Sequence, residues 1–579
     1  CCINVEAISL LSILGKKQSF KVKILFGLML ISMLLETVGI GLVLPFIDIV
    51  DKGPSSALME LGYLPNWIYD LSHKQLIYAS LIFLVSFFIV KNTFLALMAW
   101  HRASFLNIIQ NDISRRLFKG YLDMPYAFHL KKNSSHLIRA IRDEATHFIG
   151  GLDHFIEIFT QGFVLLGILT LLIWAEPVGG VIVFLILGVA GFLFHKITKN
   201  KVSEWGEENL YRERLRLQHL QQGLNGIKDV KIFRKEENFL HMFQVNNTSF
   251  LNTNKKHKFL SSLPKLWFEF LAIVGISILT SSILMQGKTI ESLVSILALY
   301  AAAIFRIMPN INNILVGLQG IQFAKANINS VRVSLLEIEK NILDKNCQTL
   351  NFNKLIEFKD VSFSYENTPN RPILKKINLK IFKGEMLGII GSSGAGKSTF
   401  VDIMIGLLSP TSGGIFADNV DISTNIQSWI GRVGYVPQDI YLTDDTLRNN
   451  IAFGVPEEEI DQNSVNEAIK LSDLKDFINN LSEGLNTKVG EHGSRLSGGQ
   501  RQRIGIARAL YHRPDLIILD EATSALDIET EKRIMESIKK ISKTKTVVII
   551  THRPSTLADC KKVYKIESGS LVDINKDIL

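Results

Sequence analysis

The chain has 579 residues, which is too long for one hydrophobic core, and 47% hydrophobic residues is a high share for a soluble enzyme. A membrane part is therefore predicted. The net charge of +9 fits either nucleic-acid binding or the basic cytoplasmic links of a membrane protein. Basic and aromatic residues are not interleaved as nucleic-acid binding requires, so we expect no nucleic-acid partner.

The cysteines and the first residues carry little chemistry. Cys1, Cys2, Cys347 and Cys560 have neither the spacing of a disulfide framework nor that of a metal site. This usage favours a reducing compartment for the globular part. Because the chain begins at Cys1 without a methionine, an incomplete or processed start is favoured over a lipidated cysteine.

Long apolar stretches predict membrane spans. Stretches of about 20 apolar residues occur near residues 22–47, 76–100, 148–175, 178–197, 263–286 and 291–322. None occurs beyond about residue 340. We therefore predict a transmembrane domain with six helical spans over residues 1–340, and a second domain over residues 341–579.

The links between spans predict the orientation. The third and fourth spans are joined by a few residues, whereas the second to third and fourth to fifth links are long, polar and helix-like. Lys16, Lys17, Lys21 and Lys23 precede the first span, and the second link is rich in Lys and Arg. This positive-inside pattern predicts that both termini are cytoplasmic.

Several charged residues lie inside predicted spans: Glu36, Lys91, Lys265, Glu269 and Arg306. A charge at bilayer depth costs at least a few kcal/mol and normally faces a cavity or a partner. Snorkelling or internal ion pairing would explain them without a functional role. The excess of cations over three spans favours an anionic substrate contacted by Lys91, Lys265 and Arg306.

From about residue 352, short β-branched runs alternate with helical segments, which predicts a doubly wound α/β domain. The sequence "GSSGAGKST" follows a buried strand and opens a helix, the context of a Walker A phosphate-binding loop. Its glycines admit backbone N–H groups to the phosphates of ATP, Lys397 reaches the β and γ phosphates, and Ser398 offers a hydroxyl to Mg²⁺. The loop consists of Gly391, Ser392, Ser393, Gly394, Ala395, Gly396, Lys397, Ser398 and Thr399.

The motifs "LSGGQRQRIGIARAL" and "LIILDEATSALD" follow the loop. In this order they resemble the ATP-binding cassette (ABC) family, and six spans before one cassette is the layout of an ABC exporter half-transporter. The resemblance implies an ATPase-coupled transporter that uses ATP and Mg²⁺. It also likens "DMPYAFHLKK" (123–132) and "GIKDVKIFRK" (226–235) to coupling segments, which could equally be solvated charged helices.

The resemblance assigns roles to single residues. Tyr365 would stack on adenine, although it could equally belong to the core, and Gln438 would sense Mg²⁺. Asp520 ends an apolar strand and is a candidate Mg²⁺ ligand together with Ser398 and Gln438. Glu521 is the candidate general base. His552 resembles the family's switch histidine, although Pro554 stands where leucine is common.

The signature motif implies a dimer. Its N–H groups form a second anion site at a helix N-terminus, which one chain cannot fold onto its own Walker A loop. In the resembled family two cassettes pair head to tail, so we expect a homodimer with ATP between the chains. The residues concerned are Ser497, Gly498, Gly499 and Gln500, with Asp527 communicating across the interface.

A closer resemblance concerns the membrane half. "LETVGIGLVLPFI", "LPKLWFE" and "YAAAIFRIMPNINNI" resemble the bacterial lipid-linked oligosaccharide flippases. This implies flipping of a polyprenyl-pyrophosphate-linked oligosaccharide from the cytoplasmic to the outer leaflet of the bacterial inner (plasma) membrane, with membrane lipids as partners. Export of a lipid A-like lipid, a peptide or a drug is the alternative. A non-transporting ABC ATPase is a third hypothesis, which the predicted spans disfavour.

Overall fold

A computed structural model describes residues 16–52, 71–175, 177–285, 290–340, 350–366, 368–523 and 525–574. The start of the chain at Cys1 therefore lies outside the described residues. The chain forms two compact units. The first comprises residues 1–124 and 131–342, and the second comprises residues 343–579 together with residues 125–130.

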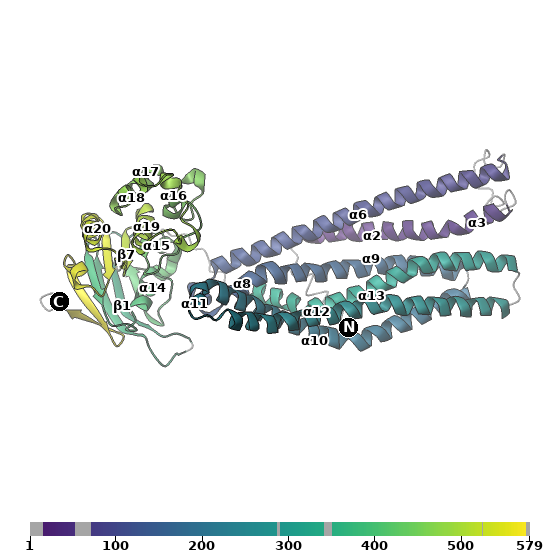
Figure 1. Cartoon of the computed structure of the whole chain (residues 1–579), viewed down its shortest axis with the longest axis horizontal. Helices are drawn as coiled ribbons and strands as arrows, with labels where there is room; N and C mark the ends of the chain where they lie inside the picture. The colour runs from purple at the N-terminus through teal and green to yellow at the C-terminus, as the bar shows by residue number, and fades with distance from the viewer. Residues whose placement is uncertain are drawn as a thin grey trace. The chain divides into compact units, whose positions relative to one another are not determined.

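The first unit is built from helices, which Figure 1 shows as long rods. They are α2 (Lys16–Gly41), α3 (Val43–Lys52), α6 (His73–Asp123), α7 (Tyr126–Lys131), α8 (Ser134–Arg139), the π-helix η2 (Ala140–Glu144), α9 (Ala145–Ala175), α10 (Pro177–Asn225), α11 (Ile227–Ile232), α12 (Glu236–Met285) and α13 (Ile290–Lys340). Most of α7 belongs to the second unit. The two segments likened to coupling segments contain the short helices α7 and α11.

Five helices of the described residues are long and apolar enough to cross a membrane: Phe20–Val50, His73–Asp123, Ser134–Trp174, Gly180–Asn225 and Glu236–Ile278. They coincide with the first five predicted spans. The sixth predicted span falls in α13, where the side chains of residues 291–300 lie outside the described part. At 1.5 Å per residue, the 51 residues of α6 span roughly 75 Å, more than twice a bilayer's hydrocarbon core.

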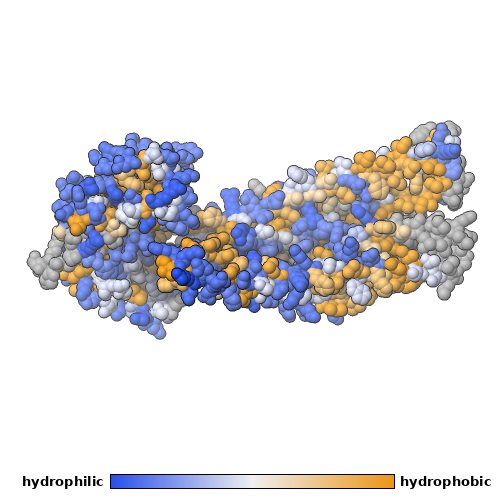
Figure 2. Space-filling view, viewed as in Figure 1, coloured by the Kyte–Doolittle hydropathy of each residue, from blue (hydrophilic) through white to orange (hydrophobic). Residues whose placement is uncertain are grey.

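The surface of the helical unit is divided into an apolar part and a polar part. Figure 2 shows hydrophobic residues over the right-hand part of the long helices and mostly hydrophilic residues over their left-hand part. Exposed apolar side chains on α6 include Ile82, Phe83, Ile89 and Val90. Large exposed apolar areas mark contact with a partner or a membrane. The apolar part of these helices is therefore suited to lipid, and their polar continuation to water.

The second unit contains two sheets. Their strands are β1 (Leu355–Phe363), β2 (Leu374–Phe382), β3 (Met386–Ile390), β4 (Ser412–Ala417), β5 (Val420–Asp421), β6 (Val433–Val436), β7 (Leu516–Asp520), β8 (Thr546–Ile550), β9 (Lys562–Glu567) and β10 (Ser570–Ile574). One sheet is antiparallel with the order β2-β1-β4-β5. The other has the order β10-β9-β3-β8-β7-β6, in which all neighbours except β10 and β9 are parallel.

The parallel strands are buried on both faces. Successive residues of β7 alternate between two apolar clusters: Leu516 and Ile518 belong to one, Ile517 and Leu519 to the other. Strands covered on both faces read as continuous apolar runs, because neither face meets water. This explains why "LIILD" is apolar up to its last residue.

Helices cover this sheet and form a further lobe. They are α14 (Lys397–Ile405), α15 (Ile426–Ile430), α16 (Leu447–Ile451), α17 (Gln462–Leu471), α18 (Lys475–Asn479), α19 (Gly498–Tyr511) and α20 (Ile528–Ile541), with the 3₁₀ turns η3 (Ile422–Asn425), η4 (Glu457–Glu459), η5 (Gly484–Asn486), η6 (Glu491–Gly493) and η7 (Pro554–Leu557). Pro554 is the first residue of η7, where its missing N–H costs no hydrogen bond.

Candidate functional site

The predicted nucleotide residues gather at the carboxyl edge of the parallel sheet. The strand β3 leads into the 391–399 loop, β7 ends at Asp520, β8 ends two residues before His552, and β6 ends two residues before Gln438. Because these strands are parallel and adjacent in the order β3-β8-β7-β6, their carboxyl ends lie at one edge. Segments far apart in sequence thus meet at one place.

The loop is held in a shape that accommodates an anion. Gly394 and Gly396 have φ values of 79° and 104°, which side chains rarely adopt. A Cβ on Gly391 would lie 2.8 Å from the backbone oxygen of Ile566, so only glycine fits there. The Lys397 ammonium donates to the backbone oxygens of Gly391 and Ser392 at 2.8 and 3.1 Å. The loop thus presents backbone N–H groups and a lysine at the N-terminus of α14.

Tyr365 lies beside this loop. Its hydroxyl is 3.2 Å from the Thr399 hydroxyl, and its ring meets that of Phe363 edge to face at 5.0 Å. With 37% of the residue exposed, the ring is not part of the buried core. The position therefore favours the stacking role over the core role.

Glu521, His552 and Lys397 form one cluster. His552 Nε2 lies 3.1 Å from Glu521 Oε1 and 3.0 Å from Lys397 Nζ. Gln438 Nε2 donates to Glu521 Oε2 at 2.9 Å. Glu521 has a φ of 50°, and its N–H donates to the Ile550 backbone oxygen, so its backbone is fixed against β8. The Glu521 carboxylate is therefore oriented by a residue on each oxygen.

Asp520 occupies a more buried position and is 9% exposed. Burial raises the pKa of its carboxyl, while a hydrogen bond from the Tyr435 hydroxyl, 3.3 Å from Oδ2, lowers it in part. Burial and the Asp520 charge together raise the pKa of Asp402 to about 6. Tyr435 and Asp402 were not predicted from the sequence, although Asp402 follows Ser398 by one helical turn and so shares its face of α14.

The oxygen donors of this site fit Mg²⁺. The Ser398 hydroxyl, the Gln438 side-chain oxygen and the Asp520 carboxylate are hard ligands of the kind that Mg²⁺ prefers. Gln438 uses its nitrogen toward Glu521, so its oxygen is not engaged in that bond. The residues present are thus compatible with a metal held beside nucleotide phosphates.

The signature residues begin α19. Ser497 is its N-cap: its hydroxyl accepts from the Gln500 N–H at 3.2 Å, and its own N–H donates to Gln500 Oε1 at 2.8 Å. Asp527 caps α20 by accepting from the Thr530 N–H at 2.9 Å, and this bond lowers the Asp527 pKa. Gln502, not predicted as functional, accepts from the Ala525 N–H at 3.0 Å. It ties the signature helix to the segment after Glu521.

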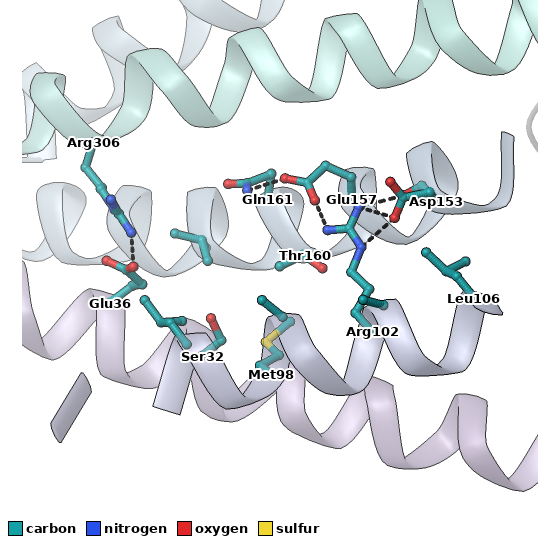
Figure 3. A pocket seen from close by; sticks show the side chains of 14 residues that line it. Ser32, Glu36, Met98, Arg102, Leu106, Asp153, Glu157, Thr160, Gln161 and Arg306 are labelled. Carbon is teal, nitrogen blue, oxygen red and sulfur yellow. Dashed lines mark hydrogen bonds and ion pairs between the residues drawn. The ribbon is translucent and has the colours of Figure 1, made fainter. Parts of the chain in front are cut away.

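Two of the three predicted substrate residues meet in the helical unit. Glu36 is 2% exposed, and its Oε2 lies 3.4 Å from Lys91 Nζ. Its Oε1 pairs with the Arg306 guanidinium, as Figure 3 shows. Lys265 is exposed and lines a different cavity of about 740 Å³ with Glu269 and other residues of α12 and α13. Internal ion pairing therefore explains why Lys91 and Arg306 can lie within predicted membrane spans. It does not explain the position of Lys265.

Both parts of the chain match known protein families. Residues 374–524 match the family model described as ABC transporter, and residues 25–308 match the ABC transporter transmembrane region. An ATP-dependent lipid A-core flippase of Wigglesworthia glossinidia brevipalpis is 29% identical over 80% of this chain and 79% of its own length. The heterocyst differentiation ATP-binding protein HepA of Nostoc sp. PCC 7120 is 31% identical over 82% of this chain and 79% of its own length.

A solved structure of a bacterial Atm1-family ABC exporter with ATP bound superposes with a TM-score of 0.80 at 21% identity, covering 95% of both chains. At this identity the likeness concerns the fold. The predicted fold class, a helical transmembrane domain followed by an α/β nucleotide-binding domain of the ABC type, is confirmed. The prediction of an ATP-hydrolysing transporter is confirmed as well.

Replacing Glu521→Gln tests the catalytic cluster. The amide keeps the shape and a hydrogen bond to its neighbours but cannot accept a proton, so ATP hydrolysis should fall by about 10²- to 10⁴-fold while ATP binding persists. Steady-state phosphate release and nucleotide binding measure the two effects. Glu536→Gln, an exposed position on α20, serves as the control. Near-normal hydrolysis by Glu521→Gln would remove that residue from its assigned role.

The Tyr435→Phe variant tests the environment of Asp520. The hydroxyl stabilises the charged carboxylate, so its loss raises the Asp520 pKa further. The carboxylate then loses its charge at higher pH, and the acid limb of the ATPase pH profile should move upward by about 0.5 to 1 unit. Tyr441→Phe alters an exposed tyrosine and should leave the profile in place. Superimposable profiles for Tyr435→Phe and wild type would contradict the assignment.

Proposed function

The chain belongs to the ABC transporter family, and on this premise we propose that it flips a polyprenyl-pyrophosphate-linked oligosaccharide from the cytoplasmic to the outer leaflet of the bacterial inner membrane. It is an exporter half-transporter and a multi-pass membrane protein that couples transport to ATP hydrolysis. The cluster of Lys397, Glu521 and His552 at the carboxyl edge of the sheet carries the ATPase assignment.

The residues of this cluster divide the chemistry among them. Lys397 and the N–H groups of the loop hold the β and γ phosphates of ATP. Glu521, oriented by Gln438 and His552, aligns the attacking water and accepts its proton. His552 contacts the γ-phosphate. Ser398, Gln438 and Asp520 would hold Mg²⁺, which would supply charge neutralisation on the phosphate oxygens.

We further propose that two identical chains act together. Each chain has one 391–399 loop and one signature helix, whose Ser497 and following N–H groups form a second anion site. In the dimer, each ATP lies between the loop of one chain and the signature of the other, and Asp527 lies near that interface. The grouping of residues 125–130 with the cassette supports the role of α7 as a coupling helix.

The substrate assignment is carried by charge in the helical unit. Two cations share the single buried carboxylate of Glu36, which leaves a formal charge of +1. The Arg306 side chain is 41% exposed, and its buried Nε has no hydrogen-bond partner among the described residues. An anionic headgroup is the natural complement of this excess, because it completes the pairing of the cations. Lys265 would add a contact outside the Glu36 cluster.

A second candidate substrate has a specific observation in its favour. The relative from Wigglesworthia glossinidia brevipalpis carries the name lipid A-core flippase and matches most of this chain. We therefore keep a lipid A-like lipid as the alternative. Both candidates are anionic lipids, and a flipping assay with each in matched proteoliposomes separates them.

Composite ATP sites can be tested with mixed dimers. A chain with both Lys397→Ala and Ser497→Ala, paired with wild type, damages both sites of a head-to-tail dimer. Pairing a Lys397→Ala chain with a Ser497→Ala chain places both defects in one site and leaves the other intact. The second heterodimer should bind ATP normally at one site, and the first at neither. Equal nucleotide binding by the two purified heterodimers would argue against this arrangement.

The Arg306→Gln variant tests the anionic substrate. Loss of a charge-assisted contact costs about 1.5–3 kcal/mol, so flipping of a pyrophosphate-linked lipid in proteoliposomes should fall at least tenfold. Arg306→Lys should restore only part of the flipping activity, because an ammonium cannot make bidentate contact. Arg332→Gln, an exposed position on the same helix, is the matched control. If Arg306→Gln flips the lipid at the wild-type rate, or if flipping of an uncharged lipid falls equally, Arg306 has a structural role and does not contact the substrate.

A further inference from the structure

The helical unit contains a cavity of about 460 Å³ that is lined from four helices, α2, α6, α9 and α13. Five charged residues line it: Glu36, Arg102, Asp153, Glu157 and Arg306. Figure 3 shows them in two separate groups, with Arg306 and Glu36 at one end and Arg102 with Asp153 and Glu157 at the other. The two ends of the cavity have opposite formal charges.

One end is positive. Glu36 contacts both Arg306 and Lys91, which is not among the residues that line the cavity, so the group carries a formal charge of +1. The ring of Phe88 lies 4.3 Å from the Lys91 ammonium and shields it. Arg306 is the half-exposed member, whereas the Glu36 side chain is 3% exposed. A ligand in the cavity therefore meets the positive charge through Arg306.

The other end is negative. The Arg102 guanidinium donates from Nε to Asp153 Oδ1 at 2.7 Å, from Nη2 to the Asp153 backbone oxygen at 3.1 Å, and from Nη1 to Glu157. Gln161 donates to the second Glu157 oxygen at 2.6 Å. One cation thus serves two carboxylates and leaves a formal charge of −1. Each of the three Arg102 nitrogens is engaged in one of these bonds. Because the Asp153 side chain is 41% exposed, this end presents oxygen acceptors to the cavity.

Neutral side chains separate the two ends. Ser32, Met98 and Thr160 lie between them in Figure 3. Along α6, Lys91 and Arg102 are separated by a rise of roughly 16 Å at 1.5 Å per residue. This rise sets only the scale of the separation between the two ends, because long side chains reach well beyond their own Cα atoms. At roughly 16 Å and an effective dielectric constant of about 20, two opposite unit charges attract by only about 1 kcal/mol, so the two ends do not pair with each other. Each end therefore keeps its own preference for a ligand group.

We propose that this cavity binds the headgroup of the transported lipid, and that the headgroup is bipolar: a phosphate at the Arg306 end and an ammonium at the Asp153 and Glu157 end, about 10 to 16 Å apart. This inference rests on the proposed function and narrows its substrate class to elongated, amine-bearing phosphate headgroups. An anion alone satisfies one end of the cavity and is repelled by the other. An ammonium group pairs with the carboxylates of the acidic end, and the phosphate pairs with Arg306 at the basic end.

Binding of ω-aminoalkyl phosphates to the whole transporter in lipid nanodiscs tests this proposal. Aminoethyl, aminohexyl and aminooctyl phosphate are each compared by calorimetry with the alkyl phosphate that lacks the ammonium. The longer amino compounds should bind about tenfold more tightly than their partners, since a charge-assisted hydrogen bond is gained. Aminoethyl phosphate is too short to reach both ends and should show no such preference.

Matched variants locate the effect. Glu157→Gln and Asp153→Asn each remove one negative charge with little change of shape, and each should abolish the preference for the amino compound. Glu207→Gln, an exposed position on α10, should retain it. Equal binding of the amino and plain alkyl phosphates to wild type would overturn the proposal. The proposal would also be overturned if both acidic-end variants kept the preference for the amino compound. Two variants are used so that the test does not depend on one that fails to fold.

The same titrations keep the two proposals apart. Comparing the binding of hexyl phosphate with that of hexanol measures the contribution of the positive end alone. Arg306→Gln should weaken the binding of hexyl phosphate. If the phosphate strengthens binding but the ammonium does not, the bipolar headgroup is wrong and the anionic substrate stands. If the phosphate contributes nothing, the proposed substrate class itself is wrong. If only the ammonium contributes, the acidic end binds a ligand that the proposed function did not anticipate.

Discussion

Parallel pairing of β3, β8, β7 and β6 is the constraint on which the nucleotide site depends. It brings four chain segments to one edge, which carry the 391–399 loop, His552, the Asp520–Glu521 pair and Gln438. The Glu521 N–H bonded to the Ile550 oxygen and the Thr551 N–H bonded to the Ile389 oxygen continue the pairing past the strand ends. The site is therefore an extension of the sheet rather than a feature of loops alone.

This constraint explains what the sequence could predict. Fully buried strands are continuous apolar runs, so the polar residues that end them are visible in the sequence and must meet at the carboxyl edge. The proposed nucleotide residues were predicted in this way and through the family motifs. Tyr435 and Asp402 were not, because their role arises from burial beside Asp520, and neither strand order nor burial can be read from their own segments.

The helical unit was less predictable. Apolar length identifies a span but not which neighbours its faces meet, since all faces of a membrane helix can be apolar. Glu36 is 55 residues from Lys91 and 270 from Arg306 in sequence, so their contact needed the fold. Internal pairing had been one open explanation for these charges. The position of Lys265 in another cavity also needed the fold. Asp153 and Glu157 lie within the third predicted span and were visible there as charges, but their pairing with Arg102 was not.

The Glu36 cluster also bears on how the chain enters the membrane. Glu36 lies on α2, Lys91 on the next long helix and Arg306 on α13, so a chain made from its N-terminus produces the carboxylate first and Arg306 last. An unpaired carboxylate in hydrocarbon is costly, whereas a paired one is less so. If α2 and α6 insert as a hairpin, Glu36 meets its partner Lys91 early in synthesis, and Arg306 then joins a carboxylate that is already paired.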